Sequence, residues 1–579
     1  MTKALRSLKK HTSLLKKIFF YILKIFIIFY IINEIYGLSK INHIVSSKSI
    51  FNDDARQQIA PFLFEDHIAN NDYIIKYHKE VFMPIGMRLI YENLINRKHI
   101  KVFSKIIPYL LYCFFLYGVY LCSSYHSTKL IGYCSTILTL LYPPILANMQ
   151  GGLPRSFAPV FLIFGLFFLI RSNYFVVGII TIGTTLFYPI AGLICGGSLF
   201  FSILFDSYQK KKALDGKNII FISLIALISF LLLIPSLYKG SKYGQRISEK
   251  RIIEFPEAGR DGRYNFFSTP PYPNVAKASL IVCDQMINQI CSITPKFSLR
   301  AHFKKSWIKI KTFIKWLIFL SFPAIFFHQI FLKKNYRYIR MFIFSFTAIF
   351  LYQTALIFEP YLYFPSRYLS YTIPIIFIII VPNFTLDMMK IFTVSNSFII
   401  NEKLISIYTI SIIIFIFNVI GKENQSQLAG VIQVDMDKPI FSEIKEIPRN
   451  SLLAGWPNGL IDNIPYLCIR RAYLHYETHQ AFHSDYVIEM RKRFSLFLNA
   501  YFGDNINNIK KLRDEGNVTH MIINKRHFIG DVFPRYFMMF EKDISDIYHM
   551  NKGNFFFANY LIDSNTDSDF VLFDLKNIK

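Results

Sequence analysis

The sequence predicts an α-helical polytopic membrane protein with about eleven spans, followed by a C-terminal soluble α/β domain. The first observation is composition, since 53% of the 579 residues are hydrophobic and only 18% are charged. Soluble domains average about 25% charged residues, so the composition argues against an ordinary soluble enzyme. The second observation is that long apolar stretches recur up to residue 421 and then stop. We therefore predict a multi-span domain over residues 1–421 and a soluble domain over residues 422–579.

Each predicted span is an apolar stretch long enough, or nearly long enough, to cross a hydrocarbon core of roughly 30 Å. The stretches are 18–37, 102–122, 130–147, 157–170, 175–188, 190–205, 219–237, 316–332, 341–358, 368–381 and 404–420. The fourth, fifth and sixth are short, so they are tilted, broken or re-entrant spans in this interpretation. We place a break near Pro189, because one continuous span there would move the basic loop at Lys210 to the opposite face of the membrane.

The net charge of +27 lies entirely in the multi-span domain. Residues 422–579 contain 19 Lys and Arg against 20 Asp and Glu, so the excess belongs to the first 421 residues. Basic residues between apolar spans usually set membrane orientation. We therefore predict no nucleic-acid partner, a cytoplasmic N-terminus, and cytoplasmic loops at Lys210 and Lys333. The Ile-, Lys-, Asn- and Phe-rich composition suggests an AT-rich bacterial genome, so the predicted location is a bacterial inner membrane.

With this orientation, the loops 38–101 and 238–315 and the C-terminal domain lie on the extracytoplasmic face. Between positions 239 and 311 the second loop contains 14 basic and 5 acidic residues. Long loops are largely exempt from the positive-inside rule, so this excess does not reverse the predicted topology. An anionic ligand at the outer membrane surface is one explanation for it.

Asp53 and Asp54 are adjacent carboxylates in the first outer loop, a short way beyond the first span. One of them could act as general base on an acceptor hydroxyl, while its neighbour orients that group or holds a cation. The alternative interpretation is a helix N-cap followed by an acidic first turn, because Asn and Asp favour such positions.

Arginines recur at other positions of the predicted outer face. In the segment 150–155, QGGLPR, the glycines would let the backbone approach a ligand, and Arg155 suits a phosphate. A tight interhelical turn is the other interpretation of this segment. The remaining candidate substrate-binding residues are Arg56, Arg260, Arg263, Glu359 and Arg367. Carboxylates for proton transfer and arginines for a phosphate leaving group suit a transferase that uses a polyprenyl-phosphate sugar. The alternative to a transferase site is that these charged residues only keep the loops solvated.

On these segments the chain resembles the GT-C superfamily of integral membrane glycosyltransferases. Those proteins have many spans, an acidic motif in the first outer loop and often a soluble C-terminal domain on the same side. More closely, the chain resembles uncharacterised bacterial multi-pass proteins with an Asp-Asp-Ala-Arg-Gln first loop. The matching segments are 51–58, 150–157, 364–368 and 454–465. The chain departs from the oligosaccharyltransferase branch, whose acceptor motif is not found in the C-terminal domain.

The resemblance implies that Asp53 or Asp54 is the catalytic base and that the donor is a lipid-phosphate sugar. It leaves the cofactor open: none is required by the sequence, and a divalent cation is an alternative.

In the C-terminal domain we expect strands at 521–524 and 570–573, and mainly helix over 464–502. His475, His479 and His483 would then share one helix face. Three histidines in a row along a helix rarely converge on one ion, so we predict hydrogen bonding or acceptor recognition here and no metal site.

The leading hypothesis is a membrane glycosyltransferase, hexosyl or pentosyl, that moves a sugar from a polyprenyl-phosphate donor to an envelope acceptor. Its expected partners are the lipid-linked donor and membrane lipids, and the oligomeric state is open. One alternative is a lipid or polysaccharide transporter, or flippase, whose polar residues would lie inside the spans. The other is a non-catalytic envelope scaffold, which gains if Asp53, Asp54, Arg155 and Arg367 lie far apart.

Overall fold

The computed structural model describes residues 49–51, 53–140, 143–259, 261–263, 330, 336–358, 361–362, 364–395, 431–433, 439–529, 533–558, 561 and 569–578. The predicted spans 18–37 and 404–420, and nearly all of 316–332, lie outside these residues, as do Arg260 and Glu359. Asp53 and Asp54 are described by their backbone alone.

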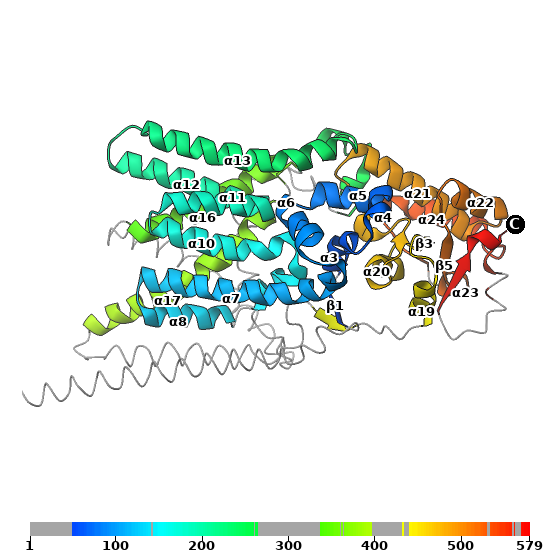
Figure 1. Ribbon diagram of the computed structural model, residues 1–579, viewed down its shortest axis with the longest axis horizontal. Coiled ribbons are helices and arrows are strands. Elements are labelled where there is room, and N and C mark those ends of the chain that lie inside the picture. The colour runs from blue at the N-terminus through cyan, green and yellow to red at the C-terminus, as the bar shows by residue number, and fades with distance from the viewer. Residues whose placement is uncertain are drawn as a thin grey trace, which may run out of the picture.

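A bundle of apolar helices forms one end of the molecule (Figure 1). Its members are α7 (Ile100–His126), α8 (Lys129–Leu140), α9 (Pro143–Asn148), α10 (Ala158–Ile170), α11 (Tyr174–Phe187), α12 (Pro189–Gln209), α13 (Gly216–Ser241), α16 (Tyr336–Ile357) and α17 (Ser366–Ser395). Within the described residues, four helical stretches are long and apolar enough to cross a membrane, namely Arg97–His126, Pro189–Gln209, Gly216–Ser241 and Arg337–Ile357. Shorter apolar helices occupy the other predicted spans there, and the total of about eleven stays a prediction.

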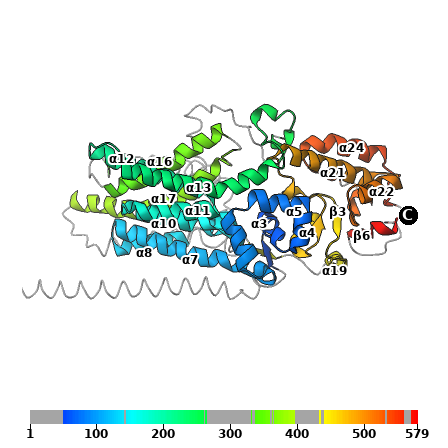
Figure 2. The ribbon, with the colours of Figure 1, turned by 45° about the horizontal axis from the view of Figure 1, so that its top comes forward.

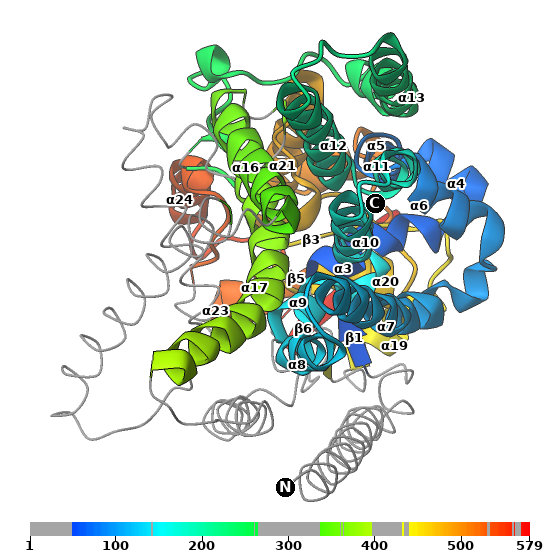
Figure 3. The same cartoon turned by 90° about the vertical axis from the view of Figure 1, so that its left-hand side faces the viewer.

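The bundle exposes α13 more than its other long helices. Viewed along the bundle, α10 lies in the middle and α13 at the edge (Figure 3). The most apolar part of α13 has a mean hydropathy of 2.7, and only 6% of it is buried by the described residues. Such a surface is stable against lipid rather than water, so α13 offers the most apolar surface among the four long helices of the described residues.

The predicted break at Pro189 is confirmed. Helix α11 ends at Phe187 and α12 begins at Pro189, where proline is favoured because the first helical residue needs no N–H partner. The turn between α12 and α13, which contains Lys210, lies at the end of the bundle away from the C-terminal sheet (Figure 1).

The first predicted outer loop folds into short helices between the bundle and the C-terminal elements (Figures 1 and 2). They are α3 (Asp53–Ile59), α4 (Asp66–Asn71), α5 (Tyr73–Tyr77) and α6 (Ile85–Arg88), with π-helical turns at His78–Phe82 and Leu89–Leu94. Strand β1 (Ser49–Phe51) pairs antiparallel with β2 (Val431–Gln433), so the segment entering this loop is tied to the segment entering the C-terminal region.

The C-terminal region contains a mixed sheet in the order β4-β3-β5-β6. The strands are β3 (Leu452–Gly455), β4 (Arg471–Ala472), β5 (His520–Asn524) and β6 (Phe570–Asp574), with only the β5–β6 pair antiparallel. Around them lie α19 (Pro439–Glu446), α20 (Leu460–Leu467), α21 (Ser484–Phe502), α22 (Ile506–Asp514), α23 (Arg526–Ile529) and α24 (Glu541–Met550). Two of the strands lie where the alternation of residues predicts them. That the region is a separate soluble domain stays a prediction.

The segment 464–502 is mainly helical, as predicted, but its middle is not. Between α20 and α21 the chain runs through β4 and a 3-10 turn (Tyr476–Thr478). The cause is tertiary: β4 pairs with buried β3, and the Tyr473 N–H donates to the Leu453 carbonyl at 2.8 Å. Pairing with a buried strand outweighs local helix propensity.

One buried apolar cluster runs from the bundle into the C-terminal sheet. It joins Phe115 and Leu162 of the bundle to Ala55 of α3, Ile464 of α20 and Leu453 of β3. The first outer loop is therefore part of the same core as the elements on either side of it.

Close packing at Gly151 and Gly152 positions α3. Both residues have positive φ, 71° and 59°. A Cβ on Gly151 would lie 2.5 Å from the Cβ of Ala55, and the Gly152 carbonyl accepts a 2.9 Å hydrogen bond from the Tyr91 hydroxyl. These glycines therefore approach protein rather than a ligand, which corrects that interpretation and favours the tight turn.

Gly151→Ala should destabilise the protein by about 2 kcal/mol or more, because it combines a left-handed backbone with overpacking against Ala55. The thermal unfolding midpoint in detergent measures this. Gly216→Ala, at the start of α13 with no atom within 4 Å of the added Cβ, is the matched control and should leave the midpoint unchanged or slightly raised. Equal midpoints for both variants would show that the contact with α3 is unimportant.

Candidate functional site

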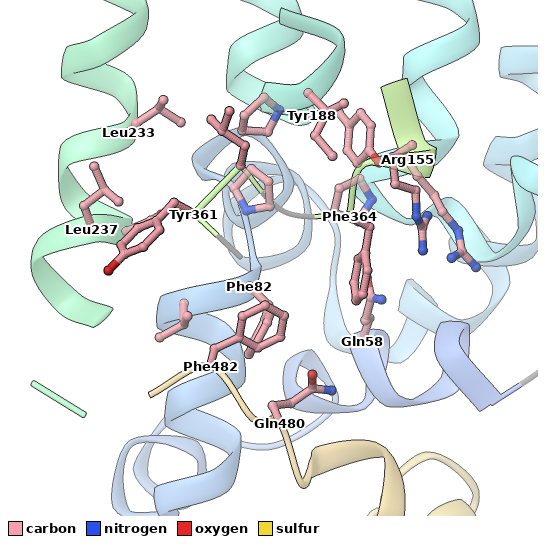
Figure 4. Close-up of a pocket in the computed structure, with 18 of the residues that line it drawn as sticks. Gln58, Phe82, Arg155, Tyr188, Leu233, Leu237, Tyr361, Phe364, Gln480 and Phe482 are labelled. Atoms are coloured by element: carbon pink, nitrogen blue, oxygen red, sulfur yellow. The ribbon is translucent and has the colours of Figure 1, made fainter. Parts of the chain in front are cut away.

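A cavity of about 350 Å³ lies where one end of the bundle meets α3 and the C-terminal region (Figure 4). Its walls come from the first outer loop, from the ends of bundle helices, and from the turn before α21. The residues used below are Gln58, His78, Phe82, Arg155, Leu193, Leu232, Leu233, Leu237, Arg246, Arg263, Arg367, Glu477, Gln480 and Phe482. Cavities of this size bind small molecules or the head of a larger one.

Four guanidinium groups line this cavity, from Arg155, Arg246, Arg263 and Arg367. Among the described lining residues the carboxylate is Glu477, and it forms an ion pair with Arg263. We call these four arginines the arginine sector. Guanidinium groups bind anions through charge-assisted hydrogen bonds, so the sector is suited to an anionic ligand.

Two of these arginines are held at the ends of bundle helices. Arg155 follows Gly151 and Gly152 in the turn Pro154–Phe157, so the packing that fixes α3 also places this side chain. Arg367 lies in the first turn of α17 and donates to the Tyr371 hydroxyl at 3.2 Å.

The other two come from the second predicted outer loop, whose residues 245–259 and 261–263 lie against the C-terminal region and are called the strap below. The Ile247 N–H donates to the Phe482 carbonyl at 3.0 Å. The buried carboxylate of Glu257 accepts from Arg491 Nε at 2.5 Å and Nη2 at 2.6 Å. The strap positions Arg246 and Arg263 at the cavity. Two of the excess basic residues of this loop therefore line the cavity.

The opposite wall of the cavity is apolar. Leu233 and Leu237 of α13 lie on one side of the cavity and Arg155 lies across it (Figure 4). Leu193 of α12 and Leu232 of α13 line the same space. The wall therefore includes part of α13, the long apolar helix that the other described residues bury least. The cavity is thus suited to a ligand with an anionic head and an apolar chain.

A third part of the wall is polar and uncharged. Gln58 of α3 and Gln480 lie at the same end of the cavity (Figure 4). His78 lines the cavity too, is 3% exposed, and has no hydrogen-bond partner for either ring nitrogen among the described residues. Leaving such a group unsatisfied costs about 1–3 kcal/mol. We call Gln58, His78 and Gln480 the neutral sector.

Of the candidate residues from the sequence, Arg155, Arg263 and Arg367 come together at this cavity. Arg56 does not line it: its side chain is 4% exposed, and burial lowers its pKa to about 10, opposed by the charge of Asp462. Asp53 and Asp54 form the first turn of α3, as the alternative interpretation expects, and Gln58 lies one turn further along the same helix.

Sequence reasoning missed Arg246 and the neutral sector. The excess charge of the 238–315 loop was a signal for Arg246, although it did not single out one residue. Nothing in the sequence distinguishes Gln58, His78 or Gln480 from other polar residues, because Gln480 lies about 400 positions from the other two and joins them only in the folded chain.

The three C-terminal histidines are held separately by protein groups. His479 Nδ1 lies 2.9 Å from the Tyr536 hydroxyl, and His483 Nδ1 lies 2.9 Å from the Tyr77 hydroxyl. His475 Nδ1 lies 3.2 Å from Asp462. In the part of the chain that the structure describes, no three His, Cys, Asp or Glu side chains are grouped as metal ligands. The carboxylates of Asp53 and Asp54 lie outside that part, so a divalent cation there stays an open alternative.

No protein-family model and no curated protein matches the chain. Among solved structures it is similar to the archaeal oligosaccharyltransferase AglB from Archaeoglobus fulgidus in complex with an inhibitory peptide and a dolichol-phosphate. Identity is 11%, the TM-score is 0.40, and the match covers 83% of this chain and 66% of that one. It is also similar to the Archaeoglobus fulgidus oligosaccharyltransferase in complex with Zn and sulfate. For that structure the identity is 11% and the TM-score is 0.40, and the match covers 82% of this chain and 64% of that one.

The chain thus spans just under two thirds of the length of these two proteins. A TM-score of 0.40 is too low to carry an argument about function, so the proposals below depend on this chain's own residues.

The buried histidines predict acid sensitivity. Burial lowers the pKa of His78 and His479 to about 3, and that of His483 to about 4, from 6.5. Below pH 6.5 the unfolded chain takes up protons that the folded chain does not, so stability is full above that pH and falls toward pH 4. At pH 5 each of these histidines should lower the free energy of unfolding by about 2 kcal/mol relative to its value at neutral pH.

Thermal unfolding in detergent at pH 7 and pH 5 tests this. His479→Gln should shrink the drop in midpoint between the two pH values, because the variant no longer gains a proton on unfolding. His549→Gln, at an exposed position, should keep the wild-type drop. A drop of the same size in both variants would contradict the assignment.

Proposed function

We propose that the protein is a membrane glycosyltransferase of the GT-C type. It transfers a sugar from a polyprenyl-phosphate donor to a hydroxyl of an envelope acceptor at the outer face of a bacterial inner membrane. The observation that carries the proposal is one cavity lined both by Arg155, Arg263 and Arg367 and by apolar side chains of α12 and α13.

The two walls suit the two parts of a lipid phosphate. Guanidinium groups bind phosphate oxygens through paired, charge-assisted hydrogen bonds. The isoprenoid chain gains free energy by burying its apolar surface, at about 25 cal/mol per Å², along Leu193, Leu233 and Leu237. A soluble nucleotide sugar would have no use for such an apolar wall.

The chemistry follows from the acid pair at the start of α3. The carboxylate of Asp53 or Asp54 takes the proton of the acceptor hydroxyl, and the acceptor oxygen attacks the anomeric carbon from the face opposite the phosphate. The bond between the anomeric carbon and the phosphate oxygen breaks, and the electron pair leaves with the polyprenyl phosphate. The arginine sector stabilises the negative charge that develops on the departing phosphate. The configuration at the anomeric carbon is inverted.

The position of the cavity favours an enzyme over a flippase. Arg155 precedes α10, Arg367 begins α17, and Arg246 follows α13, so the cations lie at helix ends. A transporter places such groups near the middle of the membrane, between spans. A passive scaffold would not require arginines from separate segments to meet in one cavity.

Replacing both Asp53 and Asp54 by Asn should abolish sugar transfer, at least 100-fold, because no base remains in the first turn of α3. The assay measures transfer from a radiolabelled undecaprenyl-phosphate sugar in membranes, with the thermal midpoint as a check on folding. Asp66→Asn, at an exposed position in the same outer loop, is the control and should retain activity. Full transfer by the double variant would refute the catalytic role of this pair.

A further inference from the structure

The neutral sector has no part in the chemistry described above. Gln58, His78 and Gln480 neither carry charge for a phosphate nor form part of the apolar wall. Gln58 is partly exposed and makes no hydrogen bond to another described residue. His78 is buried with both ring nitrogens unpartnered among the described residues. Two of the three groups therefore have hydrogen-bonding capacity that the described protein does not use.

The chemistry of these groups matches hydroxyls. A primary amide and a neutral imidazole each present a donor and an acceptor, as a sugar hydroxyl does. Burial keeps the pKa of His78 near 3, so the ring is uncharged at neutral pH and retains its acceptor nitrogen. The phosphodiester of the donor lipid is ionised near neutral pH and has acceptors but no donor, so it gains more from the arginine sector.

The surroundings of the sector suit a sugar ring. Phe82 and Phe482 line the cavity beside the two glutamines, with ring centroids 5.3 Å apart (Figure 4). The C–H groups of a sugar can pack on the faces of aromatic rings, because the face carries the negative part of the ring's quadrupole. Gln480 is fixed by its own hydrogen bond from Nε2 to the Glu477 carbonyl at 2.5 Å, so its position is set before a ligand arrives.

We propose that the neutral sector recognises the hydroxyl groups of the donor's sugar, with the phosphate in the arginine sector and the isoprenoid chain along α13. This inference rests on the proposed function, because it assigns the sugar of that same donor. It makes Gln58 and His78 specificity-determining residues, and it places the sugar beside α3, the helix that begins with Asp53 and Asp54.

The experiment compares two lipids that share the charge and the chain. One is undecaprenyl phosphate esterified to glucose, galactose, mannose or N-acetylglucosamine in turn. The other is undecaprenyl cyclohexyl phosphate, the same phosphodiester with a six-membered ring and no hydroxyls. Affinities are measured for the full-length protein in nanodiscs. The wild type should bind at least one sugar lipid about tenfold more tightly than the cyclohexyl lipid.

Two variants test the neutral sector and a third tests the arginine sector. Gln58→Leu, and separately His78→Phe, should reduce the preference to about twofold or less while leaving the affinity for the cyclohexyl lipid unchanged. Arg367→Gln should weaken binding of both lipids and keep the preference. Gln209→Leu, at an exposed position in the last turn of α12, is the matched control and should behave as wild type.

The outcomes separate the two proposals. A wild-type preference that survives Gln58→Leu, or a wild type without any preference, overturns the role of the neutral sector and leaves the lipid-phosphate site standing. A wild type that binds neither lipid overturns the proposed function itself. Because Gln58 is only partly buried, its replacement tests the role even if His78→Phe fails to fold.

Discussion

The contact between α3 and Gly151 is the constraint on which the rest of the site depends. A helix of seven residues is not stable alone in water, so its position is set by what packs around it. Ala55 is fully buried against Gly151, and the Gln57 side chain donates to the Asp462 carbonyl of α20. Held in this way, the helix presents Gln58 to the cavity. The same turn of glycines continues directly into Arg155.

The arginines around α3 fall into two groups, one buried inside the protein and one lining the cavity. The charge of Arg56 is buried near Asp462, where it helps to join α3 to the C-terminal region, and Arg56 is not among the residues that line the cavity. The arginines that do face the cavity come from helix ends and from the strap, and Glu477 is their described carboxylate. Four guanidinium groups gathered at one cavity suit an anion, which they bind through charge-assisted hydrogen bonds. Its apolar wall then favours an anion that carries a hydrocarbon chain.

The sequence predicted features that depend on local pattern, and it could not predict features that depend on long-range contact. Apolar stretches located the bundle helices, and Pro189 located a break, because both act through neighbouring residues. The helix expected at His475 and His479 is wrong because pairing of β4 with buried β3 is a long-range effect. Arg155, Arg263 and Arg367 were proposed from an assumed common face, whereas Gln58, His78 and Gln480 meet only in the folded chain.

The central claim is that a polyprenyl phosphate lies with its head in the arginine sector and its chain along α13. Photo-crosslinking with a diazirine-bearing undecaprenyl phosphate, followed by peptide mass spectrometry, tests it most directly. The account predicts labels at Leu193, Leu233 and Leu237, reduced about tenfold in the double variant Arg155→Gln, Arg367→Gln. Labels spread equally over Leu224 and Leu227, which are exposed on α13 but do not line the cavity, and unchanged in the double variant, would contradict it.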